Sequence, residues 1–353
     1  MNQIKVLVTG VGGGGLGEQT LKALKLSKLP LDIIAADVTP ISKGLSQVKR
    51  AFIVPPASSS NYINEVLSIC AAEKVNVLFC GSEAELKKLS KHRQQIIDAG
   101  IFFPINNDKV IATCLDKFKT AEFFRENNIP YPKTYKITCL SDIDQIGTFP
   151  LVLKPNTGAG GSANTMIVQS KDELFAFVKY LLGFYNEFVA QEYVGDPESE
   201  YTVGVLSDMN GKLINSIAIN RFISSGLGNR IKVKNTSGRS ELGEHLIISS
   251  GISQGEIGRF PLVTKQCEEI AQKIGSTGPL NIQCRLVNGK VYIFEINPRY
   301  SGTSSMRAMV GFNEPDLMIR HHYLNEPIKR NFEYDEGYVI RGLDEEYLPK
   351  KDK

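Results

Sequence analysis

The dipeptide Asn288-Gly289 constrains the fold of this chain more than any other short segment, because it lies between two β-branched and aromatic runs. A dipeptide of this kind in that position predicts a β-hairpin. The register of the hairpin decides which side chains share a face, since successive side chains of a strand point to opposite faces. We expect a three-residue loop over 287–289, with Gly289 in a left-handed bulge, which places Gln283 and Glu295 on one face. A two-residue loop would place them on opposite faces.

The second strand of this hairpin, FEINPR (294–299), carries polar side chains at alternate positions. Glu295, Asn297 and Arg299 are therefore expected on one side, and Phe294 and Ile296 on the other, where they would fit a core. A carboxylate and an amide oxygen beside a fixed cation suit Mg²⁺ that holds a polyphosphate. The alternative is a solvated strand face that happens to carry three polar residues.

The size and composition of the chain exclude several classes of protein. Its 353 residues exceed one core of the commonest size and predict two or three domains. A net charge of +3 with dispersed Lys and Arg gives no sign of nucleic-acid binding. No apolar run has the length of a membrane span and no signal peptide is visible, so we expect a cytoplasmic protein without a membrane partner. Six cysteines without a C-x-x-C pair indicate buried free thiols.

The first hundred residues alternate predicted strands and helices. We expect strands over 4–9, 31–36 and 75–80, and helices over 18–26 and 61–72. Such alternation predicts a parallel, Rossmann-like sheet. Gly10, Gly12 and Gly15 match the G-x-G-x-x-G pattern, and Asp37 follows the second strand, where a ribose-binding acid would lie. NAD(P) binding stays open, but a structural or substrate-contacting loop is the favoured interpretation.

A second glycine-rich loop follows a predicted strand that delivers Lys154 at its end. The loop, NTGAGGSAN (156–164), contains Gly158, Gly160, Gly161 and Ser162. Small residues let backbone N–H groups close around phosphate oxygens, while Lys154 would supply a point charge. The loop is not a Walker loop, because it lacks G-K-[ST] and a strand rather than a helix is expected after it. A flexible hairpin tip is the alternative.

Six motifs follow one another along the chain. They are Asp116-Lys117 before a helix, Lys154-Pro155 with the glycine loop, QEYV (191–194), EYTV (200–203), Asn281-x-Gln283 and Glu295-x-Asn297-Pro298-Arg299. In this order they resemble the ATP-grasp superfamily over roughly residues 110–325, and most of all its carbamoyl-phosphate-synthase large-subunit-like branch. The resemblance implies an α/β and α+β fold, in which a Rossmann-like pre-ATP-grasp domain precedes a two-lobed ATP-grasp fold.

The resemblance also implies domain boundaries. The Rossmann-like domain would span 1–110, the ATP-grasp domain 111–330 and a C-terminal extension 331–353. Within the ATP-grasp domain, a smaller lid-bearing lobe would span 111–190 and a metal and substrate lobe 191–330.

Residue roles are implied in the same way. Arg299 and Lys154 would be catalytic. ATP contacts would come from Lys117, Lys154, Gly158, Gly160, Gly161, Ser162, Glu192, Tyr193, Val194 and Glu200. Gln283, Glu295 and Asn297 would bind two Mg²⁺ ions, with Mn²⁺ as an alternative. At Lys117 and Lys154 the synthase itself tends to have arginines.

Substrate contacts are sought outside these motifs. The segment 218–239 is rich in glycine and cations, and is either a solvated mobile loop or a cover that grips an anionic substrate. From it we take Arg221 and Arg230 as candidate contacts. Ser301, Gly302 and Arg307 are further candidates, because they open a predicted helix and helix-opening N–H groups favour carboxylates.

The activity implied by the resemblance is ATP-dependent ligation of a carboxylate to an amine or ammonia through an acyl phosphate, with release of ADP and phosphate. One alternative is a carbamoyl-phosphate-synthase-like activity on bicarbonate, which the length disfavours because only one ATP-grasp unit is present. Another is a nucleotide-binding regulator or NAD(P)-binding protein without turnover. The sequence does not name the carboxylate or the amine, and it leaves open a partner amidotransferase and a homodimer.

Overall fold

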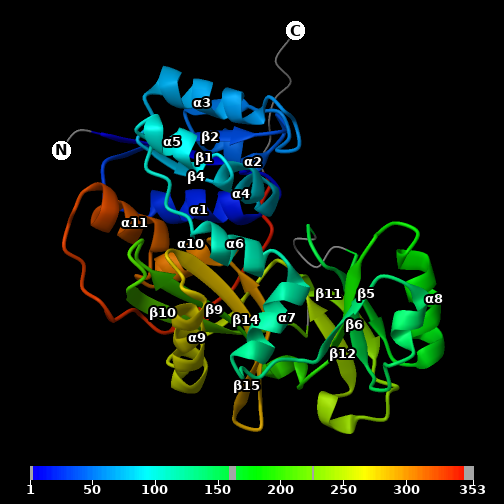
Figure 1. Cartoon of the computed structure of the whole chain (residues 1–353). Coiled ribbons are helices and arrows are strands. Elements are labelled where there is room, and N and C mark those ends of the chain that lie inside the picture. Colours follow the sequence, from blue (N-terminus) through cyan, green and yellow to red (C-terminus); the bar gives the residue numbers. More distant parts are fainter. Residues whose placement is uncertain (1–2, 159–163, 225, 346–353) are drawn as a thin grey trace.

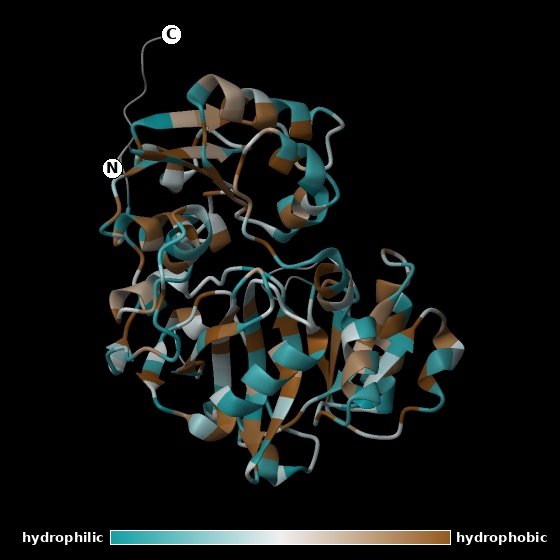
Figure 2. Cartoon of the chain, turned by 60° about the vertical axis from the view of Figure 1, so that its left-hand side comes forward, coloured by the Kyte–Doolittle hydropathy of each residue, from teal (hydrophilic) through white to brown (hydrophobic). Residues whose placement is uncertain are grey.

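The computed structural model describes residues 3–158, 164–224 and 226–345. Three parts are visible in Figure 1: an N-terminal domain, a smaller lobe around β5 to β8, and a large lobe built on a six-stranded sheet. Apolar residues concentrate on the strands and on the helix sides that face them, and hydrophilic residues lie on the outside (Figure 2). None of the helices in the described ranges is long and apolar enough to cross a membrane.

The N-terminal domain is a four-stranded parallel sheet covered by helices on both faces. Its strands, in the order β3-β2-β1-β4, are β1 (Ile4–Thr9), β2 (Leu31–Asp37), β3 (Arg50–Ile53) and β4 (Val77–Phe79). Its helices are α1 (Leu16–Lys25), α2 (Lys43–Ser46), α3 (Tyr62–Glu73), α4 (Glu83–Ser90) and α5 (Arg93–Asp98). Leu7 and Ile34 belong to one core cluster and Val8 and Ala35 to another, so alternate residues of each strand are buried on opposite faces. The predicted parallel sheet is confirmed, whereas β3 was not predicted.

The smaller lobe is an antiparallel sheet with the order β5-β8-β6-β7. Its elements are α7 (Lys117–Glu126), β5 (Thr134–Ile137), β6 (Leu151–Pro155), β7 (Met166–Val168), α8 (Lys171–Leu181) and β8 (Phe188–Glu192). As predicted, Asp116 begins α7, because its Oδ1 accepts a hydrogen bond from Lys119 N at 2.9 Å. The ends of β6 and β8 face the large lobe, because Lys154 and Glu192 line one cavity together with Glu295 of β15.

The large lobe is a six-stranded antiparallel sheet in the order β15-β14-β9-β10-β13-β16. Its strands are β9 (Glu200–Ser207), β10 (Leu213–Arg221), β13 (Gly255–Gly258), β14 (Pro279–Val287), β15 (Lys290–Asn297) and β16 (Gly337–Val339). The helices of this lobe are α6 (Asp108–Cys114), α9 (Pro261–Ile274), α10 (Ser304–Met309), α11 (Glu314–Met318) and the π-helix η6 (Ile319–Tyr323). Strands β11 (Asn229–Lys234) and β12 (His245–Ser249) form a separate pair. Much of the segment 218–239 is thus strand rather than loop, and β16 lies within the expected C-terminal extension.

The hairpin between β14 and β15 differs from the expected register. Val287 pairs with Lys290, and Asn288 and Gly289 have φ values of 50° and 75°, so the loop has two residues. The predicted three-residue loop is wrong. Further along, the pairing shifts by one residue, because Cys284 pairs with Ile293 and Gln283 with Glu295.

The shift is a β-bulge that leaves Phe294 without a partner on β14. One extra residue in β15 reverses the effect of the two-residue loop, so Gln283 and Glu295 lie directly opposite each other after all. The bulge also turns Phe294 toward the same cavity as Glu295, while Ile296 remains in the core. The expectation that Phe294 enters the core is therefore wrong.

All six cysteines are free thiols, as predicted. Five of them are buried, and Cys139 is exposed. Cys139 precedes the short 3-10 helix Leu140–Ile143 on the surface of the smaller lobe.

The turn between β1 and α1 yields a stability prediction. A Cβ on Gly17 would press against the backbone carbonyls of Thr9 and Gly10, closer than real Cβ atoms approach, whereas a Cβ on Gly15 would meet Gly12 O at an ordinary 3.5 Å. Gly17→Ala should therefore lower the free energy of unfolding by about 1–3 kcal/mol, because backbone must shift. Gly15→Ala should change it by less than about 1 kcal/mol. Urea unfolding of both variants checks this, and equal effects would contradict it.

Candidate active site

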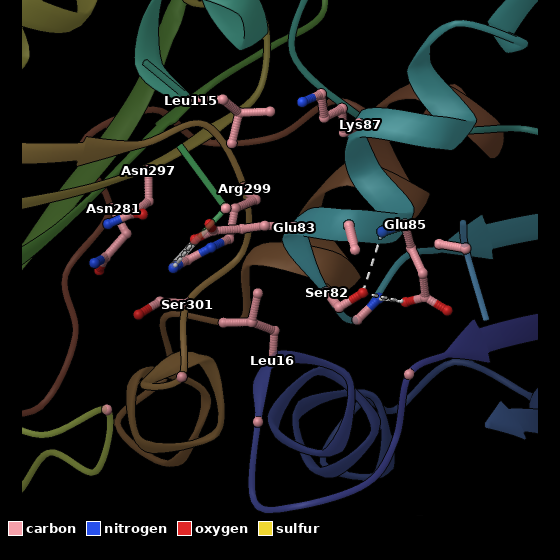
Figure 3. A pocket seen from close by; sticks show the side chains of 18 of the residues that line it. Leu16, Ser82, Glu83, Glu85, Lys87, Leu115, Asn281, Asn297, Arg299 and Ser301 are labelled. Atoms are coloured by element: carbon pink, nitrogen blue, oxygen red, sulfur yellow. Dashed lines mark hydrogen bonds and ion pairs between the residues drawn. The ribbon is translucent and has the colours of Figure 1, made fainter. Parts of the chain in front are cut away.

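Two adjoining cavities meet at the bulged hairpin. The larger, of about 1200 Å³, lies between the N-terminal domain and the large lobe and is lined by the glycine turn 10–15, the start of α4 and the ends of β14 and β15. In Figure 3, Asn281, Asn297 and Ser301 lie on the side of this space opposite the start of α4, and Arg299 lies between them and Glu83. The smaller, of about 90 Å³, lies between the two lobes. We call them the large cavity and the small cavity.

The wall between the cavities contains the residues predicted to bind metal. Gln283 and Glu295 line both cavities, and Asn297 lines the large one. Burial alone would raise the pKa of Glu295, but Lys117, Lys154 and Arg299 together lower it below the usual value. Glu295 is therefore a carboxylate at neutral pH, which suits a divalent cation.

Lys154 lies behind this wall and is only 8% exposed. Its Nζ donates hydrogen bonds to Gln191 Oε1 at 2.9 Å and to the carbonyl oxygen of Phe294 at 3.4 Å. Burial lowers the pKa of Lys154 to about 8, although Glu295 opposes the shift. The bulge residue thus holds the lysine through its backbone.

Two buried donors beside Glu295 lack a hydrogen-bond partner in the described part of the chain. They are Asn297 Nδ2 and Arg299 Nε. Arg299 is otherwise fixed, because its Nη2 donates to Glu83 Oε1 at 3.0 Å and its Nη1 to Tyr300 O at 3.2 Å. Since buried donors in folded proteins are nearly always satisfied, this corner of the large cavity is suited to a ligand rich in oxygen atoms.

The residues expected to bind a nucleotide gather around the small cavity. Its lining includes Lys117, Lys154, Glu192, Tyr193, Val194 and Glu200. Tyr193 is held in place because its hydroxyl donates to Ile247 O at 3.1 Å and accepts from Ile247 N at 2.8 Å. Gly158 lines the large cavity, and Gly160, Gly161 and Ser162 lie outside the described residues.

Glu200 is engaged by two arginines that the sequence reasoning did not connect with it. Its Oε1 accepts from Arg221 Nη1 at 2.9 Å, and its Oε2 accepts from Arg285 Nη2 at 3.0 Å. All three side chains are buried. A ribose contact by Glu200 stays a prediction, and in this structure both of its oxygens have partners.

The five predicted substrate contacts do not all reach the large cavity. Arg221, Ser301 and Gly302 line it. Arg230 is exposed on β11 and is not part of the lining. Arg307 is completely buried, and its guanidinium binds Glu314 and Asn281 Oδ1. Arg307 therefore faces the interior of the large lobe and is not part of the lining, and its contact with substrate stays a prediction.

Backbone N–H groups of the N-terminal glycine turn donate hydrogen bonds to carboxylates of the chain itself. Asp37 accepts hydrogen bonds from Gly12 N at 2.8 Å and from Ser42 Oγ at 2.7 Å, and Gly14 N donates to Glu18 Oε2 at 2.9 Å. An acid that binds its own loop in this way is not available to ribose hydroxyls. The turn therefore fits a structural role better than NAD(P) binding.

Comparison with known families identifies the class of protein that this fold and site define. A model described as the ATP-grasp domain matches residues 114–303, and a model described as the PylC-like N-terminal domain matches residues 6–103. The chain therefore belongs to the ATP-grasp family, whose proteins use ATP and Mg²⁺. The predicted family and fold class are confirmed.

Curated relatives include carbamoyl phosphate synthase large chains. The chain is 25% identical over 202 residues to that of Thermoplasma acidophilum and 24% identical over 318 residues to that of Caldanaerobacter subterraneus subsp. tengcongensis. The matches cover 54% and 85% of this chain but only 17% and 27% of the relatives. The chain thus spans less than a third of the length of these relatives.

Similar solved structures support the fold alone. The ADP complex of purK, an N5-carboxyaminoimidazole ribonucleotide synthetase, has a TM-score of 0.65 at 15% identity, covering 95% of this chain and 80% of that chain. The L-amino acid ligase from Bacillus licheniformis has a TM-score of 0.63 at 15% identity, covering 91% and 74%.

The lowered pKa of Lys154, about 8, predicts proton uptake on nucleotide binding. Phosphate oxygens placed near Lys154 would raise its pKa, so binding of Mg-ADP at about pH 8.5 should draw protons from the buffer. Lys154→Arg should bind with much smaller uptake, because arginine stays charged in this range. Calorimetric titration in two buffers of different ionisation enthalpy measures the uptake. Equal uptake by both proteins would contradict the assignment of Lys154.

Proposed function

We propose that this ATP-grasp ligase joins a carboxylate to an amine or ammonia through an acyl phosphate and releases ADP and phosphate. The observation that carries the proposal is the wall formed by Gln283 and Glu295, which line both cavities. A nucleotide bound between the two lobes, where the small cavity of about 90 Å³ must widen to admit it, would present its terminal phosphate at this wall. A carboxylate in the large cavity could then approach it from the other side.

The charges around the wall suit phosphoryl transfer, which needs positioning and charge neutralisation more than covalent help from the protein. Lys117 and Lys154 would bind ATP phosphates, and Arg299 would reach the transferred phosphoryl group. All three act on the pKa of Glu295, so their charges lie near it. The cluster carries more positive than negative charge, which favours a polyphosphate.

The same residues fit a divalent cation. Glu295 supplies an anionic oxygen, Gln283 lies opposite it in the hairpin, and the side-chain amide of Asn297 is buried beside it. We assign one Mg²⁺ to Gln283 and Glu295 and a second to Glu295 and Asn297. When bound, Mg²⁺ neutralises phosphate charge and orients the terminal phosphate.

The chemistry balances without a nucleophile from the protein. A substrate carboxylate oxygen attacks the terminal phosphorus of ATP, and ADP leaves with the electron pair of the broken bond. The amine loses a proton to solvent and attacks the acyl carbon. The carbon–oxygen bond to phosphate then breaks, phosphate leaves with its electron pair, and the amide nitrogen releases its second proton to phosphate or solvent. Arg221, Ser301 and Gly302 line the large cavity and are our candidates for holding the carboxylate substrate.

Release of ADP and phosphate tests the function. The purified protein with Mg-ATP is given a panel of carboxylates with and without amines, including ammonium and bicarbonate. Release that needs both a carboxylate and an amine, with a matching amide product, supports the proposal. Release that needs only bicarbonate would instead indicate carbamoyl-phosphate-synthase-like chemistry. Nucleotide binding with no release on any combination would indicate a regulator.

The wall predicts a sharp effect of a single substitution. Glu295→Gln should lower turnover by roughly 10³-fold or more, because a neutral amide replaces the anionic metal ligand while the shape is kept. Turnover and thermal unfolding are measured together to separate chemistry from folding. The matched control is Glu269→Gln, which changes an exposed glutamate on α9 and should retain turnover within about twofold. Full activity of Glu295→Gln would contradict the metal assignment.

A further inference from the structure

Six carboxylates line the large cavity in the described part of the chain, and most are already engaged. They are Asp37, Glu83, Glu85, Asp108, Asp116 and Glu295. Asp37 accepts hydrogen bonds at one oxygen from Gly12 in the glycine turn and at the other from Ser42 in its own loop. Both oxygens of Glu85 accept from neighbours, among them Tyr62 and Ser82. Glu295 belongs to the proposed metal site.

The two acids near the start of α6 and α7 are also placed by local contacts. Asp116 caps α7 through Lys119 N, and Asp108 pairs with Arg93 at 3.1 Å. Asp108 is mostly exposed, since 73% of its side chain is accessible. Neither residue contacts Arg299, so neither is linked to the expected position of the transferred phosphoryl group.

Glu83 differs from the other five. It comes from the first turn of α4 in the N-terminal domain and reaches the segment that follows β15, where its Oε1 accepts from Arg299 Nη2 at 3.0 Å. Figure 3 shows the two side chains directed at each other across the cavity. The second oxygen, Oε2, has no hydrogen-bond partner among the described residues. A carboxylate oxygen is therefore free beside the arginine assigned to phosphoryl transfer.

Such an oxygen suits the second substrate of the proposed reaction. An alkyl amine is an ammonium cation near neutral pH, and it must come close to an acyl phosphate that lies against Arg299. The charges of Glu295 and the phosphates are matched by the two lysines and the bound cations, so without a further negative group Arg299 would repel this ammonium cation. A carboxylate that neutralises Arg299 through one oxygen and accepts an N–H from the ammonium through the other removes the repulsion.

We propose that Glu83 binds the ammonium group of the acceptor amine and so selects a cationic amine as the second substrate. The inference rests on the proposed ligase function. It makes the N-terminal domain the source of amine specificity, while the phosphate chemistry stays with the ATP-grasp domain. Glu83 thereby becomes a specificity-determining residue, and Arg299 is its anchor.

Hydroxylamine separates this role from a merely structural one, because it attacks acyl phosphates while uncharged near neutral pH. Wild type is first assayed for hydroxamate with Mg-ATP and each of a panel of amino and other carboxylic acids. The carboxylate that gives hydroxamate is then paired with ammonium chloride and with L-lysine as cationic acceptors. Glu83→Gln keeps an oxygen for Arg299 but removes the negative charge.

Glu83→Gln should raise the KM for the cationic acceptor about 10- to 100-fold, because this is the loss of affinity expected when one hydrogen bond between charged groups is removed. Hydroxamate formation should stay within about threefold of wild type, because it does not use the lost charge. The control Asp108→Asn removes another acid of the large cavity and should leave both reactions within about twofold. Thermal unfolding and Mg-ADP affinity verify that each variant is folded.

Three outcomes would overturn the inference. An equal loss of hydroxamate and amide formation in Glu83→Gln would mean that Glu83 only positions Arg299 for the phosphoryl step. An unchanged KM for the cationic acceptor would mean that another group recognises the amine. Absence of hydroxamate with wild type for every carboxylate would contradict the ligase function itself, and is distinguished from the others because it precedes any substitution.

Discussion

Phe294, the one residue of β15 that has no partner on β14, sets the geometry on which the proposed chemistry depends. The two-residue turn at Asn288-Gly289 would by itself leave Gln283 and Glu295 on opposite faces of the hairpin. The bulge adds one residue and brings the two side chains opposite each other in the wall between two cavities. It also directs the carbonyl oxygen of Phe294 to Lys154. The bulge thus positions both the Glu295 carboxylate and the Lys154 ammonium group.

The electrostatics of the wall follow from burial combined with unequal charge. Burial lowers the pKa of Lys154 and would by itself raise the pKa of Glu295, so burial disfavours the charged form of both residues. The opposite charge of each residue favours the charged form of the other. Arg299 is paired with Glu83, whereas Lys117 adds a partly buried positive charge that Glu295 and Lys154 do not leave balanced. This excess of positive charge favours a negatively charged ligand. Phosphate oxygens with a bound cation would complete the charge balance.

Sequence reasoning predicted the elements well and their irregularities poorly. Strands β1 and β2 were predictable, because β-branched runs end at glycine or aspartate, and Asn288-Gly289 marked the hairpin. The bulge at Phe294 has no local signal, since FEINPR alternates like a regular strand. The pairing of Glu83 with Arg299 joins residues 216 positions apart, and only the folded chain reveals it. The complete burial of Arg307 was not predictable, because arginines are seldom fully buried unless paired and its partner Glu314 lies outside every motif.

The central claim is that Gln283 and Glu295 hold a divalent cation against the terminal phosphate of ATP, between a nucleotide cavity and a substrate cavity. A crystal structure with Mn²⁺ and a non-hydrolysable ATP analogue tests it most directly, because Mn²⁺ is located by its anomalous scattering. The account predicts an anomalous peak within coordination distance of Gln283 Oε1 and the Glu295 carboxylate, with the terminal phosphate facing Arg299. A peak bound by other side chains, or a triphosphate directed away from this wall, would contradict it.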